Sequence, residues 1–216
     1  MYLKMVNAMA KNPLDFKYIE NGLIFHLDGI NTGPITGYWT DLIGGIAFRI
    51  TNGVGRANNG FVFPESSSAV YLLGTDKVNL IATDDTLTLE IVMTAGTSGT
   101  RYIFSGGSGT DIALVMSGGS LTVRENRKTR FVTTNSVNLS TYSINNYYAL
   151  QNLTELTSYG TDYWQGPTGN AVVGGWRTDR QFVGTICDIR IYNRVLTKDE
   201  IRANQQIDII RYGIQV

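Results

Sequence analysis

The 216-residue sequence predicts an all-β fold with one helix near the C-terminus. Apolar and polar residues alternate with a period of two along much of the chain, as half-buried strands require. Glycine is frequent, with 24 residues, and only 17% of residues are charged, which suits many short strands joined by tight turns. One segment near the C-terminus carries clear helix signals instead.

Two parts of the chain are distinguished, an N-terminal arm over residues 1–20 and one domain over residues 21–216. The arm mixes Lys, Asn, Met and Pro13 without a clear period, and a first short helix is the alternative. Its many apolar residues do not suit a solvated tail, which would be polar and highly charged. The arm therefore either folds back on its own sandwich or packs on a partner chain, and the second interpretation is favoured.

The strand signals begin in GLIFHLDG, where Leu23, Phe25 and Leu27 alternate with Ile24, His26 and Asp28. The clearest alternation lies in TLTLEIVM at residues 86–93, where one face is apolar and the other holds Thr and Glu90. Shorter candidates are GIAFRI, GFVF, AVYLLG, RYIF, DIALVM, SLTV and RFVTT, and a Ser-Gly-Gly-Ser turn at 117–120 joins two of them as a hairpin.

The C-terminal third predicts one long strand followed by a helix. The strand lies in QFVGTICDIRIYNR at residues 181–194, where the single cysteine, Cys187, is expected to point into the sandwich as a small apolar residue. Thr197 and Glu200 form a capping-box pattern before Ile201, so a helix is expected from about Lys198 to Arg211. Gly213 is the expected stop.

Composition and charge exclude several functions. The 18 basic and 18 acidic side chains leave no basic excess, which argues against a nucleic-acid partner. One cysteine and one histidine provide neither an internal disulfide nor a Cys/His zinc set. No run approaches the roughly 18 apolar residues of a membrane span, so no membrane insertion is expected. No export signal is recognised at the N-terminus, although the domain is of an extracellular type.

The segment FVGTICDIRIYNRVLTKDEI resembles the closing signature of concanavalin A-like, laminin G-like jelly rolls. A weaker match is the opening GLIFHLDGIN with the turn at Trp39, Asp41, Leu42 and Gly44, and the likeness spans roughly residues 22–204. The resemblance implies a jelly-roll sandwich of two stacked antiparallel sheets. The residues that match the closing signature are Phe182, Gly184, Ile186, Ile189, Arg190, Tyr192, Asn193, Arg194, Leu196, Thr197, Glu200 and Ile201.

One departure from the family pattern concerns metals. The family often has Phe-Asp-Gly with further acids after the third strand, where this chain has Phe63-Pro64-Glu65 followed by serines. No cofactor is therefore expected, and calcium is kept as the alternative. Its candidate ligands by composition are Asp84, Asp85, Asp28 and Asp41, although the Asp84-Asp85 pair before a strand is more often a turn or cap, because Asp bonds its own backbone there.

No catalytic residues are predicted. Glycosidases on this kind of sandwich place carboxylates two residues apart on one strand, because one must protonate the leaving oxygen while another attacks. Glu90 stands alone in its strand, and Asp199 and Glu200 lie at a helix start, where they favour the helix dipole. His26, the one histidine, is interpreted as structural.

Aromatic residues gather between Tyr147 and Trp176 in a turn-rich region, and they predict a binding site for sugars. Sugar rings stack on aromatic faces while acids, amides and arginines take the hydroxyl groups, and binding residues often lie on loops. The alternative is that some of these aromatics are core. The predicted ligand-binding residues are Tyr148, Tyr159, Tyr163, Trp164, Trp176, Arg177 and Asp179.

The function expected from the sequence is a non-enzymatic binding or adhesion module that recognises a glycan or another surface ligand. A capsid or fibre decoration protein on a phage virion surface would explain an adhesion-type domain without an export signal. Its arm would contact other virion proteins in an oligomer or larger assembly. The alternatives are a secreted or cell-surface bacterial lectin-like domain, a glycosidase of the same fold, and a purely structural decoration protein.

Overall fold

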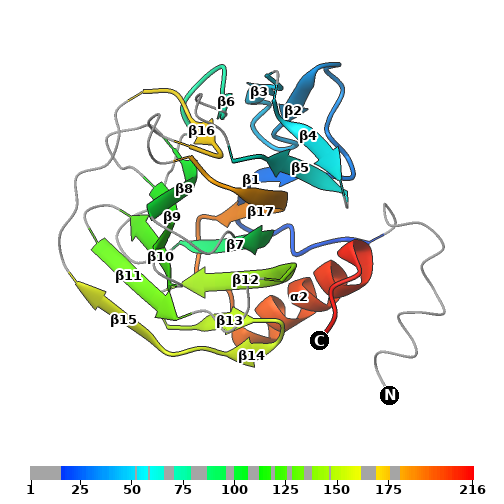
Figure 1. The fold of residues 1–216 in the computed structure, drawn as a ribbon. Coiled ribbons are helices and arrows are strands. Elements are labelled where there is room, and N and C mark those ends of the chain that lie inside the picture. The colour runs from blue at the N-terminus through cyan, green and yellow to red at the C-terminus, as the bar shows by residue number, and fades with distance from the viewer. Residues whose placement is uncertain are drawn as a thin grey trace.

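The computed structural model describes residues 16–216 apart from 52, 58, 66–70, 79–86, 96–99, 107–111, 118–119, 126–127, 134–137, 146, 162–168 and 176–180. Side chains are described for the same residues except 95, 112, 117, 124–133 and 158–161. The described residues form two large antiparallel sheets, a two-stranded ribbon and one C-terminal helix, so the chain is an all-β sandwich as the sequence predicts (Figure 1).

The larger sheet has eight strands in the order β14-β13-β12-β7-β17-β5-β4, with β1 paired to β17 beside β5. Strands β5 and β1 share one edge of β17, because β5 pairs with its first residues and β1 with its last. The bounds are β1 Leu23–Asp28, β4 Gly55–Ala57, β5 Gly60–Phe63, β7 Thr88–Ala95, β12 Ser140–Asn145, β13 Ala149–Gln151, β14 Thr154–Glu155 and β17 Gly184–Tyr192.

The smaller sheet has seven strands in the order β15-β11-β10-β9-β8-β16-β6, and a separate two-stranded ribbon pairs β2 with β3. The hairpin expected around residues 117–120 is confirmed by the antiparallel pairing of Ser117 with Ser120. The bounds are β2 Tyr38–Thr40, β3 Ala47–Arg49, β6 Leu72–Leu73, β8 Thr100–Ser105, β9 Ile112–Ser117, β10 Ser120–Glu125, β11 Lys128–Thr133, β15 Ser158–Thr161 and β16 Val172–Val173.

A single large apolar cluster joins the two sheets. It takes alternate residues from the larger sheet, such as Ile91 and Ile189, and from the smaller sheet, such as Phe104 and Leu114. Burial of alternate side chains from two facing sheets is the packing that defines a β-sandwich. The predicted apolar face Leu87, Leu89, Ile91 and Met93 lies in this cluster.

Strand β17 lies between β7 and β5 in the larger sheet, and this crowded position explains why the closing signature has a glycine at position 184. Gly184 has a φ of 143°, and a Cβ at that position would lie 2.3 Å from the carbonyl oxygen of Thr94 on β7. Only a residue without a side chain allows the two backbones to approach this closely.

The predicted helix is confirmed as α2, Lys198–Tyr212. Thr197 is the N-cap and forms a complete capping box with Glu200, and Gly213 ends the helix in the left-handed conformation. Ile201 is buried as expected, and Ile209 is half-buried against an apolar cluster with Val92 and Cys187. Cys187 is therefore buried on the helix side of the sheet, outside the apolar core between the sheets where the sequence placed it.

Replacing Thr197 by alanine should lower the free energy of unfolding by about 1 kcal/mol, because the Glu200 amide would lose its capping acceptor. Urea unfolding followed by circular dichroism measures the change. The matched control is Thr154→Ala at an exposed position of β14, where we expect a change within about 0.5 kcal/mol. Equal effects of the two substitutions would contradict a specific role of the cap.

The larger sheet contains features that the sequence analysis did not predict, among them strand β12 and an irregularity in β1. In β12 Tyr142 and Ile144 alternate with Thr141, Ser143 and Asn145, so only two apolar residues mark the strand, and its polar face is buried as well. In β1 a register shift between Leu23 and Phe25 breaks the expected alternation, and Leu23 packs on a different cluster from Phe25.

The last residues of the predicted arm contact the domain itself. The Tyr18 side chain is buried and its hydroxyl donates to Asp208 Oδ1 at 2.7 Å, while the Ile19 amide donates to Asn204 Oδ1 at 3.0 Å. A deletion through residue 18 would therefore remove a buried side chain of this domain. The predicted docking of the arm on a partner concerns mainly residues 1–15, which lie outside the described residues.

Among the described residues, α2 is the longest helix and has neither the length nor the apolar character of a membrane-spanning segment.

Candidate functional site

Helix α2 packs on the larger sheet through a mostly polar face. Its buried residues recur at spacings of three and four, which places them on one side of the helix. Of these residues only Ile201 is aliphatic. The buried residues are Ile201, Asn204, Gln205, Asp208, Arg211 and Tyr212.

The sheet presents a matching polar row beneath the helix. His26 on β1 pairs with Arg190 on β17, which pairs with Glu90 on β7, which pairs with Ser143 on β12. Directly opposed residues on neighbouring strands point to the same face, so the four side chains form a line across the sheet. All four are buried, and the second face of TLTLEIVM is therefore as buried as the first.

Arg190 is the centre of this interface. Its Nε donates to Glu90 Oε2 at 3.0 Å, and its Nη1 donates to Asp188 Oδ1 at 2.9 Å. Nη1 also donates to Asp208 Oδ1 of α2 at 2.8 Å, and Nη2 donates to Asp208 Oδ2 at 2.7 Å. The guanidinium also lies 3.8 Å from the centre of the Tyr18 ring, a distance typical of a cation–π contact.

A second guanidinium lies beside the first group. Arg211 Nη2 donates to Asp28 Oδ2 at 2.6 Å, and the Tyr212 hydroxyl lies 3.2 Å from Asp28 Oδ1 and 2.9 Å from Asp188 Oδ2. His26 Nε2 lies 3.1 Å from the same Asp188 Oδ2. We call Asp28, Glu90, Asp188, Arg190, Asp208 and Arg211 the buried charge cluster.

Burial and mutual charge shift the pKa values of these groups. Desolvation raises the pKa of Glu90 to about 7, although Arg190 acts to lower it. Desolvation acts to lower the pKa of Arg190, but the anionic groups around it raise that pKa well above its usual value. Desolvation also raises the pKa of Tyr212 well above its usual range, with Asp188 and Asp28 adding to the shift, so its hydroxyl keeps its proton. Burial raises the pKa of Cys187 to about 12, so the thiol is not a nucleophile.

One edge of this cluster opens into a cavity of about 510 Å³, which we call the N-terminal pocket. Its polar lining includes His26, Asp28 and Arg211, which join it to the buried charge cluster. Its apolar lining includes Phe16 and Ile43. A cavity of this size lies within the range of small-ligand sites in proteins.

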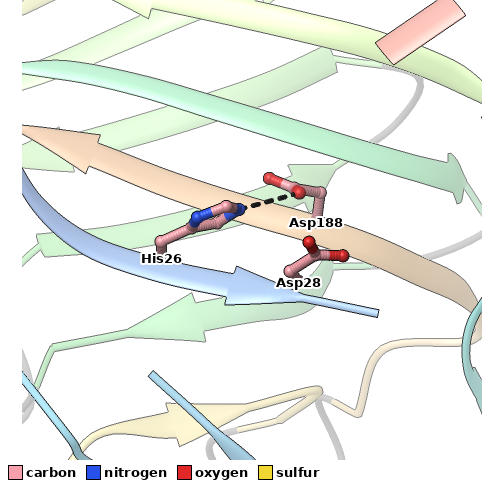
Figure 2. Close-up of side chains that lie close together, drawn as sticks. All are labelled: His26, Asp28 and Asp188. Carbon is pink, nitrogen blue, oxygen red and sulfur yellow. Dashed lines mark hydrogen bonds and ion pairs between the residues drawn. The ribbon is translucent and has the colours of Figure 1, made fainter. Parts of the chain in front are cut away.

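His26, Asp28 and Asp188 converge beside this pocket (Figure 2). Each offers one ligand atom, and these atoms lie within 4.8 Å of one another. His26 and Asp28 are two residues apart on β1, and Asp188 is the cross-strand partner of Asp28 on β17. The strand period and the register therefore bring the three side chains to one face.

The calcium candidates of the sequence do not come together as one site. Asp41 accepts from the amides of His26, Ile43 and Gly44, so it caps the turn after β2. Desolvation raises the Asp41 pKa, although these amides oppose the shift. Asp28 belongs to the buried charge cluster. Asp84 and Asp85 lie outside the described residues.

Of the predicted sugar-binding residues, Tyr148 alone has a described side chain. It is half-buried against the apolar cluster that contains Leu150 and Leu196, its ring lies 6.2 Å from that of the exposed Tyr147, and Lys198 Nζ lies 4.8 Å from its centre. Tyr159 belongs to β15, but its side chain lies outside the described residues. Tyr163, Trp164, Trp176, Arg177 and Asp179 also lie outside them, so the grouping stays a prediction.

Sequence reasoning missed the polar interface. One signal could have revealed it, since Asn204, Asp208 and Arg211 repeat at spacings of four and three along the helix. A polar stripe is normally interpreted as the solvated face, and only the packing shows that it is the buried one. Arg190 was noted as part of the family signature but not as the centre of a cluster.

Comparison with solved structures places the chain among β-rich domains. It is similar to a Trypanosoma rangeli sialidase in complex with sialic acid, with 17% identity and a TM-score of 0.56 over 88% of this chain and 33% of that one. It is also similar to the receptor-binding domain of botulinum neurotoxin D, with 12% identity and a TM-score of 0.56 over 88% of this chain and 53% of that one. These likenesses show the fold alone.

The chain thus spans about a third of the sialidase and about half of the toxin domain. The comparisons with protein families and with curated protein sequences found no match.

Proposed function

We propose that this chain is a non-enzymatic binding module that holds a glycan or a similar polyhydroxylated surface ligand in the N-terminal pocket. The observation that carries the proposal is the composition of that pocket. A cavity of about 510 Å³ places the apolar Phe16 and Ile43 beside the polar groups of His26, Asn31 and Arg211. A sugar needs this combination of an apolar surface for its C–H faces and fixed polar groups for its hydroxyls.

The charged groups behind the pocket support binding over catalysis. Asp28 accepts from Arg211 and from the Ile30 and Asn31 amides, so its carboxylate is fixed as an acceptor. Glu20 is the other acid of the described lining. Hydrolysis of a glycoside needs two carboxyl groups that flank the bond, one as acid and one as base or nucleophile. A carboxylate that is fixed as an acceptor does not supply the acid of such a pair.

Two further parts of the proposal rest on the sequence. Membership in the concanavalin A-like, laminin G-like family rests on the closing signature from Phe182 to Ile201, whose strand and helix the structure contains as β17 and α2. Display on a phage virion surface stays a prediction. One of the structural neighbours is a receptor-binding domain, and a binding role for this chain is consistent with that likeness.

A pocket-blocking variant tests the proposal. Ile43 lines the pocket and is half-exposed, so Ile43→Arg should fill the cavity without disturbing the core. On a glycan array we expect the wild type to bind at least one glycan class and Ile43→Arg to lose at least about tenfold in affinity, or about 1.4 kcal/mol. The matched control is Leu73→Arg, which is equally exposed but lies outside the pocket lining and should bind as the wild type.

Other outcomes of the same experiment contradict the proposal. Loss of binding in Tyr147→Ala with full binding in Ile43→Arg would move the site to the aromatic region that the sequence singled out. Hydrolysis of β-glucans, galactans or sialosides above background by the purified chain would replace the binding module by an enzyme.

A further inference from the structure

We propose that His26, Asp28 and Asp188 bind one divalent cation of the zinc class at the floor of the N-terminal pocket. This inference goes beyond the proposed function and does not depend on which ligand the pocket holds. It rests on the geometry of the three side chains, on a missing proton, on the charge of the cluster and on the access that the pocket provides.

The geometry suits a single ion. The three ligand atoms lie within 4.8 Å of one another, and His26 Nε2 is 3.1 Å from Asp188 Oδ2. Zinc binds nitrogen and carboxylate oxygen at about 2.0–2.2 Å, so the ligands of one tetrahedral ion lie about 3.3 Å apart. The side chains come from two hydrogen-bonded strands of a sheet, which keeps them in place before any ion arrives.

The contacts of Tyr212 show that this site lacks a positive charge or a proton. Its hydroxyl lies within hydrogen-bonding distance of Asp28 Oδ1 and Asp188 Oδ2, but a phenol has one proton to donate. With both carboxylates ionised, one of the two contacts joins two acceptor oxygens. A cation bound to the carboxylates relieves that repulsion, and Tyr212 then keeps one of its contacts.

The charge of the surroundings also favours a cation. The buried charge cluster holds four carboxyl groups, Asp28, Glu90, Asp188 and Asp208, and only two guanidinium groups. When all are ionised, two negative charges are left without a counter-charge among the described residues, in a region where unpaired charge is costly. One divalent ion would balance them.

Protons are the competing means of neutralisation. The Glu90 pKa of about 7 lets that carboxyl take up one proton near neutral pH. Metal ligands must be deprotonated, so a metal and protons compete, and the metal should bind more tightly as the pH rises.

The donor set indicates the class of ion. One imidazole nitrogen with two carboxylate oxygens suits zinc, whereas calcium prefers six to eight oxygens. Arg190 contacts Asp188 Oδ1, Arg211 contacts Asp28 Oδ2, and the Ile30 and Asn31 amides donate to Asp28 Oδ1, so both carboxylates are held in a fixed orientation. His26 and Asp28 line the pocket, which provides the access route and an open coordination position.

Calorimetric titration of the chelator-treated full chain with Zn²⁺ alone tests the proposal. We expect one ion per chain, with proton release measured in two buffers of different ionisation enthalpy, and affinity about tenfold weaker at pH 6 than at pH 7.5. Saturation should raise the Tm by roughly 5 °C or more. No binding at one equivalent, or a stability that follows pH but not Zn²⁺, would overturn the site in favour of protons.

Single substitutions test where on the chain the ion binds. His26→Gln should weaken Zn²⁺ binding at least about tenfold. Asp41→Asn is the matched control, because Asp41 is buried and bonded to the His26 amide but is not one of the ligands. Asp199→Asn controls for surface chelation on the exposed helix start. Unchanged binding in a folded His26→Gln overturns the site, and the glycan result for Ile43→Arg stays independent of it. If His26→Gln does not fold, the wild-type stoichiometry and pH dependence decide.

Discussion

Replacing Arg190 by methionine should lower the free energy of unfolding by about 3–5 kcal/mol. The substitution leaves Glu90, Asp188 and Asp208 buried without the cation that they share, since Arg190 donates to all three and is fully buried. Methionine occupies much of the volume, so the loss reports on charge and hydrogen bonds more than on packing. Urea or thermal unfolding measures it, and failure to fold would be the extreme form of the same result.

The matched control for Arg190 is Arg202 on α2. Its ion pair with Asp199 spans 3.7 Å between half-exposed and fully exposed side chains. Solvent screens such pairs, so Arg202→Met should change stability by no more than about 0.5 kcal/mol. If Arg190→Met changed the free energy of unfolding as little as Arg202→Met, the buried charge cluster would not be what stabilises the contact between α2 and the sheet.

The second large effect is a dependence of stability on pH that comes from Glu90. Its pKa is about 7 in the folded chain and near 4.5 when unfolded, because burial disfavours the charged carboxylate. Between these values the folded chain holds a proton that the unfolded chain has lost. The contribution of Glu90 to stability therefore falls as the pH rises from about 4.5 to about 7, and the full penalty applies above about 7.

The size of this penalty follows from the shift. Each pKa unit corresponds to about 1.4 kcal/mol. At pH 8 the wild type should therefore be about 3 kcal/mol less stable than it would be if Glu90 kept its proton in both the folded and the unfolded chain. Glu90→Gln keeps the shape and mimics the protonated carboxyl. We expect the free energy of unfolding of this variant to vary less between pH 5.5 and 8 than that of the wild type, as measured by urea titrations at several pH values.

Glu200→Gln is the control for the pH series. The Arg194 guanidinium beside Glu200 lowers the pKa of that carboxyl to about 2, so Glu200 does not titrate between pH 5.5 and 8. Its variant should be less stable overall, since it loses an ion pair, but should keep the wild-type slope. A Glu90→Gln variant that also keeps that slope would mean that Glu90 is ionised throughout, held by Arg190, Asn204 and Ser143.

The two predictions also bear on the proposed zinc site. Both concern the excess of negative charge around Arg190, and neither changes a proposed ligand. If Glu90 holds a proton at neutral pH, the cluster is short of one positive charge instead of two. Chelator-treated protein should therefore be used for the pH series, so that protons are the only cations that vary.

Local patterns in the sequence were sufficient for the architecture. Alternation in residues 86–93 defined the apolar face of β7, and the Thr197–Glu200 capping box with Gly213 defined both ends of α2. These features depend on neighbouring residues alone, because strand period, capping and left-handed glycine are properties of a short segment. An all-β fold with a terminal helix follows from summing such segments, whereas the two-sheet sandwich was implied by the resemblance of the closing signature.

The candidate site was not visible in the same way. Thr88 and Glu90 occupy the face of β7 that alternation assigns equally well to solvent or to a second layer, and Asn204 and Asp208 form what would ordinarily be a solvated stripe. A polar residue is buried only when a partner satisfies it, and the partners of Glu90 lie 53, 100 and 114 residues away along the chain. The register of β7 with β12 and β17 brings Glu90 to Ser143 and Arg190, and the packing of α2 across the sheet adds Asn204. Both are properties of the tertiary structure that no short segment reveals.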